Sequence, residues 1–144
     1  MRLLFSLCLL AACVACTPDS DTSVSSVDML TERMLADQDM VDAITARYFY
    51  QNTERLDRPA SGGIAPEDWT RIEQEPHLAK KLFTDAGYSR ASEIAAAFNR
   101  FHDLKPTLYE AYRELPQQFT ETEMNSALLR VEASLGVKTQ IPVR

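Results

Sequence analysis

The sequence predicts an all-α protein, a small bundle of four to five helices, and three observations support this prediction. Apolar residues recur at three- and four-residue steps along most of the chain after residue 26. Proline- and glycine-containing segments divide these stretches into separate helices. Valine and isoleucine are scattered singly, and no stretch alternates for long with a period of two, so the sequence offers no candidate strands.

Composition places the chain among ordinary globular domains. It has 144 residues, of which 45% are apolar and 25% are charged, a size and balance that fit a single core. Fifteen Lys and Arg stand against 21 Asp and Glu, which gives a net charge of -6. Because nucleic acids and anionic headgroups attract basic surfaces, we expect no nucleic-acid partner.

All three cysteines lie within the first 16 residues, so the rest of the chain has no thiol for a disulfide, a metal or catalysis. Arg2 is followed by an unbroken run of small and apolar residues, and this run gives way to Thr17-Pro18-Asp19. Such a pattern is typical of a secretory signal. The run is shorter than the roughly 20 apolar residues that a transmembrane helix needs.

Within this run, Leu10-Ala11-Ala12-Cys13 resembles the lipobox of bacterial lipoproteins. The resemblance implies a signal peptide over residues 1–12, a diacylglyceryl group on the sulfur of Cys13, and acylation of the new terminal amine after cleavage. Cys16 is the alternative lipidation site, and an ordinary cleaved signal with incidental cysteines is the other interpretation. In such proteins, an Asp directly after the lipidated cysteine commonly signals retention at the inner membrane. Here Val14 follows Cys13 and Thr17 follows Cys16. The resemblance therefore implies an outer-membrane protein that faces the periplasm and carries no cofactor beyond its covalent lipid.

We expect residues 13–26 to form a lipidated tether, residues 27–136 a helical domain, and residues 137–144 a loose tail. The first helix should run from Val27 to Leu56, with a break available between Asp37 and Asp39. A loop over residues 57–63 follows, and two short helices should begin at Pro66 and Pro76, the second ending before Gly87.

The second half of the chain predicts two further helices. Ser89 is placed to cap a helix whose apolar stripe continues beyond Pro106 to Leu115, so that this helix must kink or restart at the proline. Thr120 and Glu123 have capping-box spacing and should open a last helix that stops at Gly136. One central core is expected, made of Val41, Ile44, Leu82, Phe83, Phe98, Phe101, Leu108, Leu128 and Val131.

Few side chains suggest chemistry. The two histidines, His77 and His102, have no partner at a metal-ligand spacing, so no metal site is expected. His102 lies one turn before Pro106, whose missing N–H frees a carbonyl, and a histidine that satisfies this carbonyl is the simplest interpretation. No nucleophile with an identifiable base and no phosphate-binding loop is present, so the sequence favours a protein without enzymatic activity.

Tyr48-Phe49-Tyr50 is the most unusual stretch, because three successive aromatic residues on a helix cannot all face one core. Tyr48 continues the stripe of Ile44 and should be buried. Phe49 and Tyr50 are then candidates for contact with a partner, unless they are buried between two neighbouring helices.

These observations predict a lipid-anchored adaptor that binds another protein of the cell envelope. Two alternatives stay open. The first is a carrier of a small molecule or cofactor, with a pocket near His102 lined by Phe98, Phe101 and Tyr109. The second is an envelope hydrolase of unknown type.

Overall fold

The structure, a computed structural model, describes residues 25–137, and all regular secondary structure in this range is helical. The all-α prediction is therefore confirmed, but the predicted number of four to five helices is too low, because this range contains seven α-helices and one short 3-10 helix. The α-helices are α1 (Ser26–Ala36), α2 (Gln38–Leu56), α3 (Pro66–Gln74), α4 (Ala79–Asp85), α5 (Ala91–Ala111), α6 (Leu115–Gln118) and α7 (Glu121–Ser134), and η1 (Pro76–Leu78) precedes α4.

The larger number has two local causes. Asp37 adopts an extended conformation and divides the first predicted helix into α1 and α2. Its carboxylate accepts hydrogen bonds from the N–H groups of Asp39 and Met40, so the residue that ends one helix caps the next. The second cause lies after Tyr112, where the predicted continuation to Leu115 is interrupted and the separate short helix α6 begins.

Most predicted helix ends are confirmed, and one cap is corrected. The capping box of Thr120 and Glu123 is present, and Gly87 and Gly136 both have positive φ at the stops of α4 and α7. Ser89 does not cap α5. Its hydroxyl donates to Asp57, at 2.5 Å, and the other carboxylate oxygen of Asp57 accepts the N–H of Arg90, the residue at the N-cap position of α5, at 2.7 Å.

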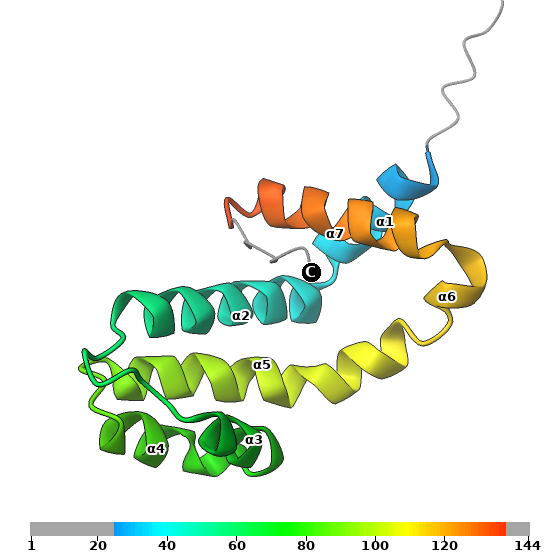
Figure 1. Ribbon diagram of the computed structural model, residues 1–144. Helices are drawn as coiled ribbons and strands as arrows, with labels where there is room; N and C mark the ends of the chain where they lie inside the picture. Colours follow the sequence, from blue (N-terminus) through cyan, green and yellow to red (C-terminus); the bar gives the residue numbers. More distant parts are fainter. Residues whose placement is uncertain (1–24, 138–144) are drawn as a thin grey trace, which may run out of the picture.

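The helices form three tiers, of which the middle one is an antiparallel pair (Figure 1). Helices α2 and α5 run side by side in opposite directions and share the most extensive contact in the structure. Helix α4 packs on α5 together with η1, and α3 lies with them on the same side. Helices α1 and α7 pack on each other at the other side of α2. This arrangement makes α2 and α5 the shared frame of the two outer tiers.

The interior is divided into two clusters and not gathered in the one predicted core. The first cluster, between α5 and the α3–α4 tier, contains Ile72, Ala79, Leu82, Phe83, Tyr88, Ala91, Ile94, Ala95 and Phe98. The second, between α1, α2 and α7, contains Leu30, Met34, Ile44, Leu115, Ala127, Val131 and Val137. Val41, Phe101, Leu108 and Leu128 were predicted to be core residues and are only half-buried. The division arises because α2 packs Tyr50 on the first cluster and Tyr48 on the second.

Pro106 lies inside α5, which continues through it to Ala111. Figure 1 shows that the axis of α5 bends in this second half of the helix. Of the two predicted alternatives, a kink or a restart, the structure has a continuous helix. The helical domain also extends slightly beyond its predicted limits, since Ser25 caps α1 and Val137 is buried.

Two buried carboxylates are each paired with an arginine. Glu54 accepts two hydrogen bonds from the Arg58 guanidinium and one from the Tyr88 hydroxyl. Burial, together with this bond, raises the pKa of Tyr88 to about 12. Glu132 of α7 accepts from Arg47 of α2 at 2.7 Å and so joins two tiers. Pairing of this kind is what allows charged groups to be buried.

The cap that Asp57 provides should make the stability of the fold depend on pH. The bonds from Ser89 and then from the backbone N–H of Arg90 lower the pKa of Asp57 below its ordinary value of 3.8. This stabilisation is therefore complete above pH 3.8 and is lost as the pH falls through the lowered pKa. In urea unfolding, Asp57→Asn should be less stable than wild type at neutral pH, and the difference should shrink in acid. A difference that stays constant with pH would contradict the role of the charge.

Candidate functional site

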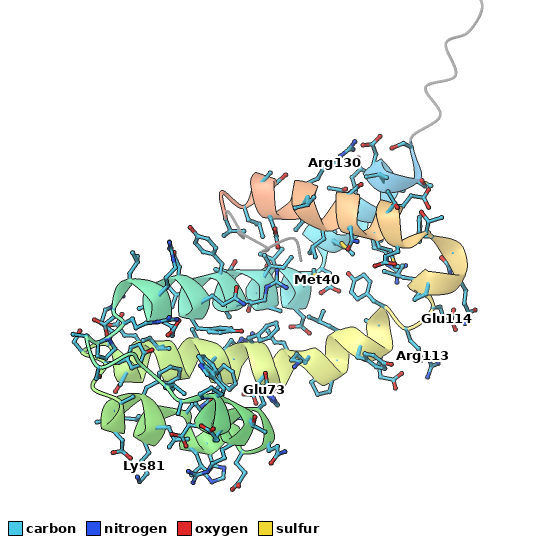
Figure 2. All side chains as sticks on the ribbon, viewed as in Figure 1. Met40, Glu73, Lys81, Arg113, Glu114 and Arg130 are labelled. Atoms are coloured by element: carbon cyan, nitrogen blue, oxygen red, sulfur yellow. The ribbon has the colours of Figure 1, made fainter. Side chains whose placement is uncertain are left out.

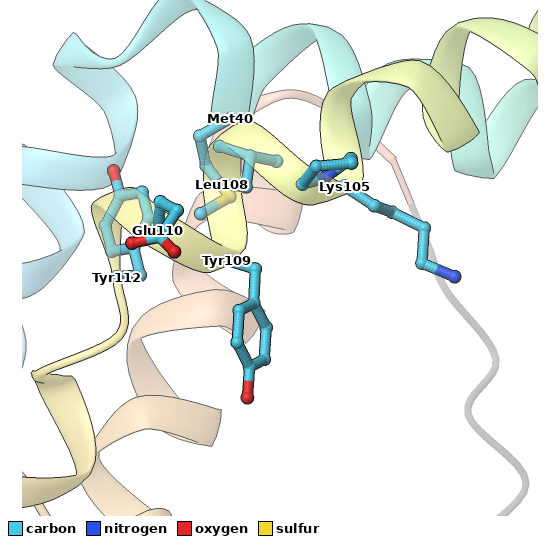
Figure 3. A pocket seen from close by; sticks show the side chains of 7 residues that line it. Met40, Lys105, Leu108, Tyr109, Glu110 and Tyr112 are labelled. Carbon is cyan, nitrogen blue, oxygen red and sulfur yellow. The ribbon is translucent and has the colours of Figure 1, made fainter.

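A large hollow on the surface lies along the second half of α5, and we call it the α5 groove (Figure 3). It has a volume of about 620 Å³ and is open to solvent along one side. Its lining is mainly apolar and consists of Met40, Lys105, Pro106, Leu108, Tyr109, Glu110 and Tyr112. Lys105 and Glu110 point away from each other on opposite sides of Tyr109.

Tyr109 is the most exposed large apolar side chain of the described residues, at 76%. Figure 3 shows its ring directed away from α5 at the mouth of the groove. One turn earlier, Pro106 lacks the N–H that would bond to the carbonyl of His102 in a regular helix. The groove therefore combines an exposed aromatic ring with a stretch of helix whose backbone bonding is incomplete.

Tyr112 forms the fixed end of the α5 groove. Its hydroxyl donates to Asp37 at 2.9 Å, and the guanidinium of Arg33 lies 5.0 Å from the centre of its ring. Arg33 also donates to the carbonyl of Ala111. Burial and the bond to Asp37 raise the pKa of Tyr112 to about 12, so its hydroxyl stays protonated and remains a donor. These contacts hold the end of α5 against the junction of α1 and α2.

A second hollow, the interlayer cleft, lies between α7 and the α2–α5 pair and has a volume of about 260 Å³. It is lined by Met34, Met40, Ala43, Ile44, Arg47, Phe101, Leu108, Leu115, Met124, Asn125 and Leu128. Met40, at the start of α2 (Figure 2), and Leu108 line both hollows, so the two are neighbours. Arg47 is the one charged residue of the cleft lining, and its Nε is buried with no acceptor among the described residues.

The residues predicted to line a pocket near His102 do not gather in one place. Phe98 is buried in the first cluster, where its ring meets Tyr50 edge-on at 5.4 Å. His102 lies against Phe98 and lines neither hollow, whereas Phe101 lines the cleft and Tyr109 the α5 groove. The reason is distance along the helix, because 11 residues separate Phe98 from Tyr109, roughly 16 Å of helix at 1.5 Å per residue.

The aromatic triplet points in three directions. Tyr48 is half-buried against the second cluster, and Tyr50 packs on Phe98 and Phe101. Phe49 is 39% exposed, and Arg90 covers part of its ring at 5.6 Å. Of the two predicted partner contacts, Phe49 is therefore the more exposed, and Tyr50 is half-buried.

Sequence reasoning did not anticipate the α5 groove as a whole. Met40 and Tyr112 lie 72 residues apart in the sequence, on two different helices. The available signal was Tyr109 itself, a large aromatic residue that follows Pro106 by three positions and falls outside the buried positions of α5. What assembles the groove is the break at Asp37, which brings Met40 to the end of α5.

Within residues 25–137, no group of His, Cys, Asp and Glu is arranged to hold a metal ion, and no helix is long and apolar enough to cross a membrane. Cys13 and Cys16 lie outside the described residues. Searches against family models, curated proteins and solved structures find no match.

The surroundings of Phe49 and Tyr50 predict unequal effects of truncation. Tyr50→Ala should lower the free energy of unfolding by about 2 kcal/mol, because it removes a ring that packs on two others and leaves a cavity. Phe49→Ala should cost only about 0.5 kcal/mol, the effect of a surface position with a weak cation contact. Urea unfolding measures both values. Equal losses would show that Phe49 is as much a core residue as Tyr50.

Proposed function

We propose that this chain is a lipid-anchored, non-enzymatic binding protein of the bacterial cell envelope that holds another envelope protein at the α5 groove. The observation that carries this proposal is the exposed ring of Tyr109 at the mouth of an apolar groove. Tyrosine is favoured at protein interfaces, because its ring buries a large apolar area while its hydroxyl can bond at the edge.

The lining of the groove is consistent with a protein partner. Apolar side chains of the partner would fill the space between Met40, Leu108 and Tyr109 and displace water from it. Lys105 and Glu110 lie at its rim, where charges orient a partner more than they strengthen its binding. The partner surface that fits is therefore an apolar patch flanked by charges of both signs.

The location of the protein is proposed from the sequence. The lipobox-like segment favours lipid attachment at Cys13, with Cys16 as the alternative. Two or three acyl chains, each stabilised by about 0.8 kcal/mol per buried methylene, would hold the chain at a membrane. The residue after the cysteine favours the outer membrane, so that the helical domain would face the periplasm.

The shape of the groove favours this adaptor over the carrier alternative. Small ligands are usually enclosed, with 70–90% of their surface buried, and the α5 groove is open along one side. The predicted pocket residues are also divided between the first cluster, the cleft and the groove. An extended or helical segment of a protein would suit an open groove better than a small molecule would.

Crosslinking in intact cells, followed by mass spectrometry, tests the proposal. Tyr109→Ala should reduce crosslinks to envelope proteins severalfold and change stability by no more than about 0.5 kcal/mol, because the ring is exposed. Phe49→Ala is the matched control, since it removes an exposed ring outside the groove. Loss of crosslinks in the Phe49 variant alone would move the binding surface to α2, and unchanged crosslinks in both variants would overturn the adaptor proposal.

The anchor has its own test. Cys13→Ser should abolish labelling by radioactive fatty acid and block or shift processing of the precursor, because serine oxygen is a poorer nucleophile than cysteine sulfur. Cys16→Ser should keep the label. The reverse pattern would assign the lipid to Cys16, and absence of label from the wild-type chain would leave an ordinary cleaved signal.

A further inference from the structure

We propose that the segment after α7, residues 138–144, binds along the interlayer cleft and covers its apolar lining. This inference does not rest on the proposed partner-binding function, because the cleft and the α5 groove are separate hollows that share only Met40 and Leu108. The occupant of the cleft would then be a segment of the same chain.

The end of α7 places the start of the segment at the second cluster. Gly136 has a φ of 68°, its N–H donates to the carbonyl of Ala133, and the N–H of Val137 donates to the carbonyl of Glu132. This hydrogen-bonded stop folds Val137 back onto the last turn of α7. Val137 is 8% exposed and belongs to the second cluster, which also contains the cleft residues Met34 and Ile44.

The spacing of apolar residues in the segment fits the cleft. Leu128 and Met124, two apolar residues that α7 gives to the cleft, precede Ser134 by six and ten residues, or roughly 9 and 15 Å of helix. Ile141 and Val143 follow Val137 by four and six residues, or at most about 14 and 20 Å of extended chain. A segment that returns along α7 can therefore reach both residues, with a few ångströms left for crossing into the cleft.

The chemistry of the segment suits an extended conformation with one apolar face. Ile141 and Val143 are two residues apart, so they lie on the same side of an extended chain. Pro142 between them disfavours the helical conformation for Ile141. The segment would thus present two apolar side chains to the cleft and its polar residues to solvent.

The cleft also offers an unused hydrogen-bond donor. The Nη2 of Arg47 is held by Glu132, whereas its Nε is buried and has no acceptor among the described residues. A buried donor without a partner is costly, and a backbone carbonyl of an extended segment would satisfy it.

Disulfide trapping in the full chain tests this placement. Asn125 is exposed, lines the cleft and lies next to Met124, so Asn125→Cys combined with Val143→Cys should form a disulfide on mild oxidation of isolated envelopes. Ser126→Cys combined with Val143→Cys is the matched control, because position 126 lies at nearly the same height on α7 but is turned away by about 100°. Trypsin releases positions 125 and 126 in one peptide and position 143 in another, so mass spectrometry identifies the link despite the native cysteines.

The cleft pair should link at least about tenfold faster than the control pair, because docking raises the local concentration of one thiol at the other. Adding Ile141→Asp to the cleft pair should bring its rate down to that of the control. Equal rates for the two pairs would overturn the proposal. Links found only between separate chains on a non-reducing gel would also overturn it, since the occupant would then be a second copy.

Methionine oxidation gives a second measurement without introduced cysteines. Met124 lines the cleft and is half-buried, whereas Met29 is 52% exposed on α1. Hydroxyl-radical labelling of the double variant Ile141→Asp/Val143→Asp should raise oxidation of Met124 severalfold and leave Met29 unchanged. Buried Met34 reports on the fold and should stay protected. An unchanged Met124 would show that the segment does not cover the cleft.

Discussion

Two aspartates that flank α2 fix its position against α5, and the rest of the structure depends on this pairing. Asp37 precedes α2 and accepts the hydroxyl of Tyr112 at the end of α5. Asp57 follows α2 and accepts the backbone N–H of Arg90 at the start of α5. Asp37 also accepts the N–H of Asp39 at the start of α2, and Asp57 also accepts the hydroxyl of Ser89, so two side chains organise three helix ends.

The α2–α5 pair in turn separates two interiors. The first cluster lies between α5 and the α3–α4 tier, and the second lies between α2 and the α1–α7 tier. Where the outer tier of α1 and α7 meets the pair, the packing leaves the interlayer cleft and, beside it, the α5 groove. Both hollows therefore follow from one architectural feature, a third tier that covers only part of the central pair.

Local signals in the sequence were sufficient for some helix boundaries, such as those at Gly87 and Thr120, but not for the tertiary arrangement. Thr120 with Glu123, and Gly87 with Tyr88, act within one turn of chain, so their spacing predicts the structure they form. The cap on α5 could not be predicted, because Asp57 lies 33 residues from Arg90. The single predicted core failed for a similar reason, since the apolar stripe of a helix does not tell which neighbour receives each side chain. The α5 groove could not be predicted either, because it depends on both the break at Asp37 and the position of α5.

The two aspartates couple the lengths of α2 and α5. Inserting one residue into either helix would advance one end by about 1.5 Å and rotate it by about 100°, which would separate one aspartate from the donor that it binds at the end of α5. Length changes within this pair would thus have to occur in both helices together. The segment from residue 58 to residue 65, which connects α2 to α3, carries no such constraint on helix length. This connecting segment should therefore tolerate insertions more readily than α2 or α5 does. The same holds for insertions that arise in evolution and for those introduced to carry a label.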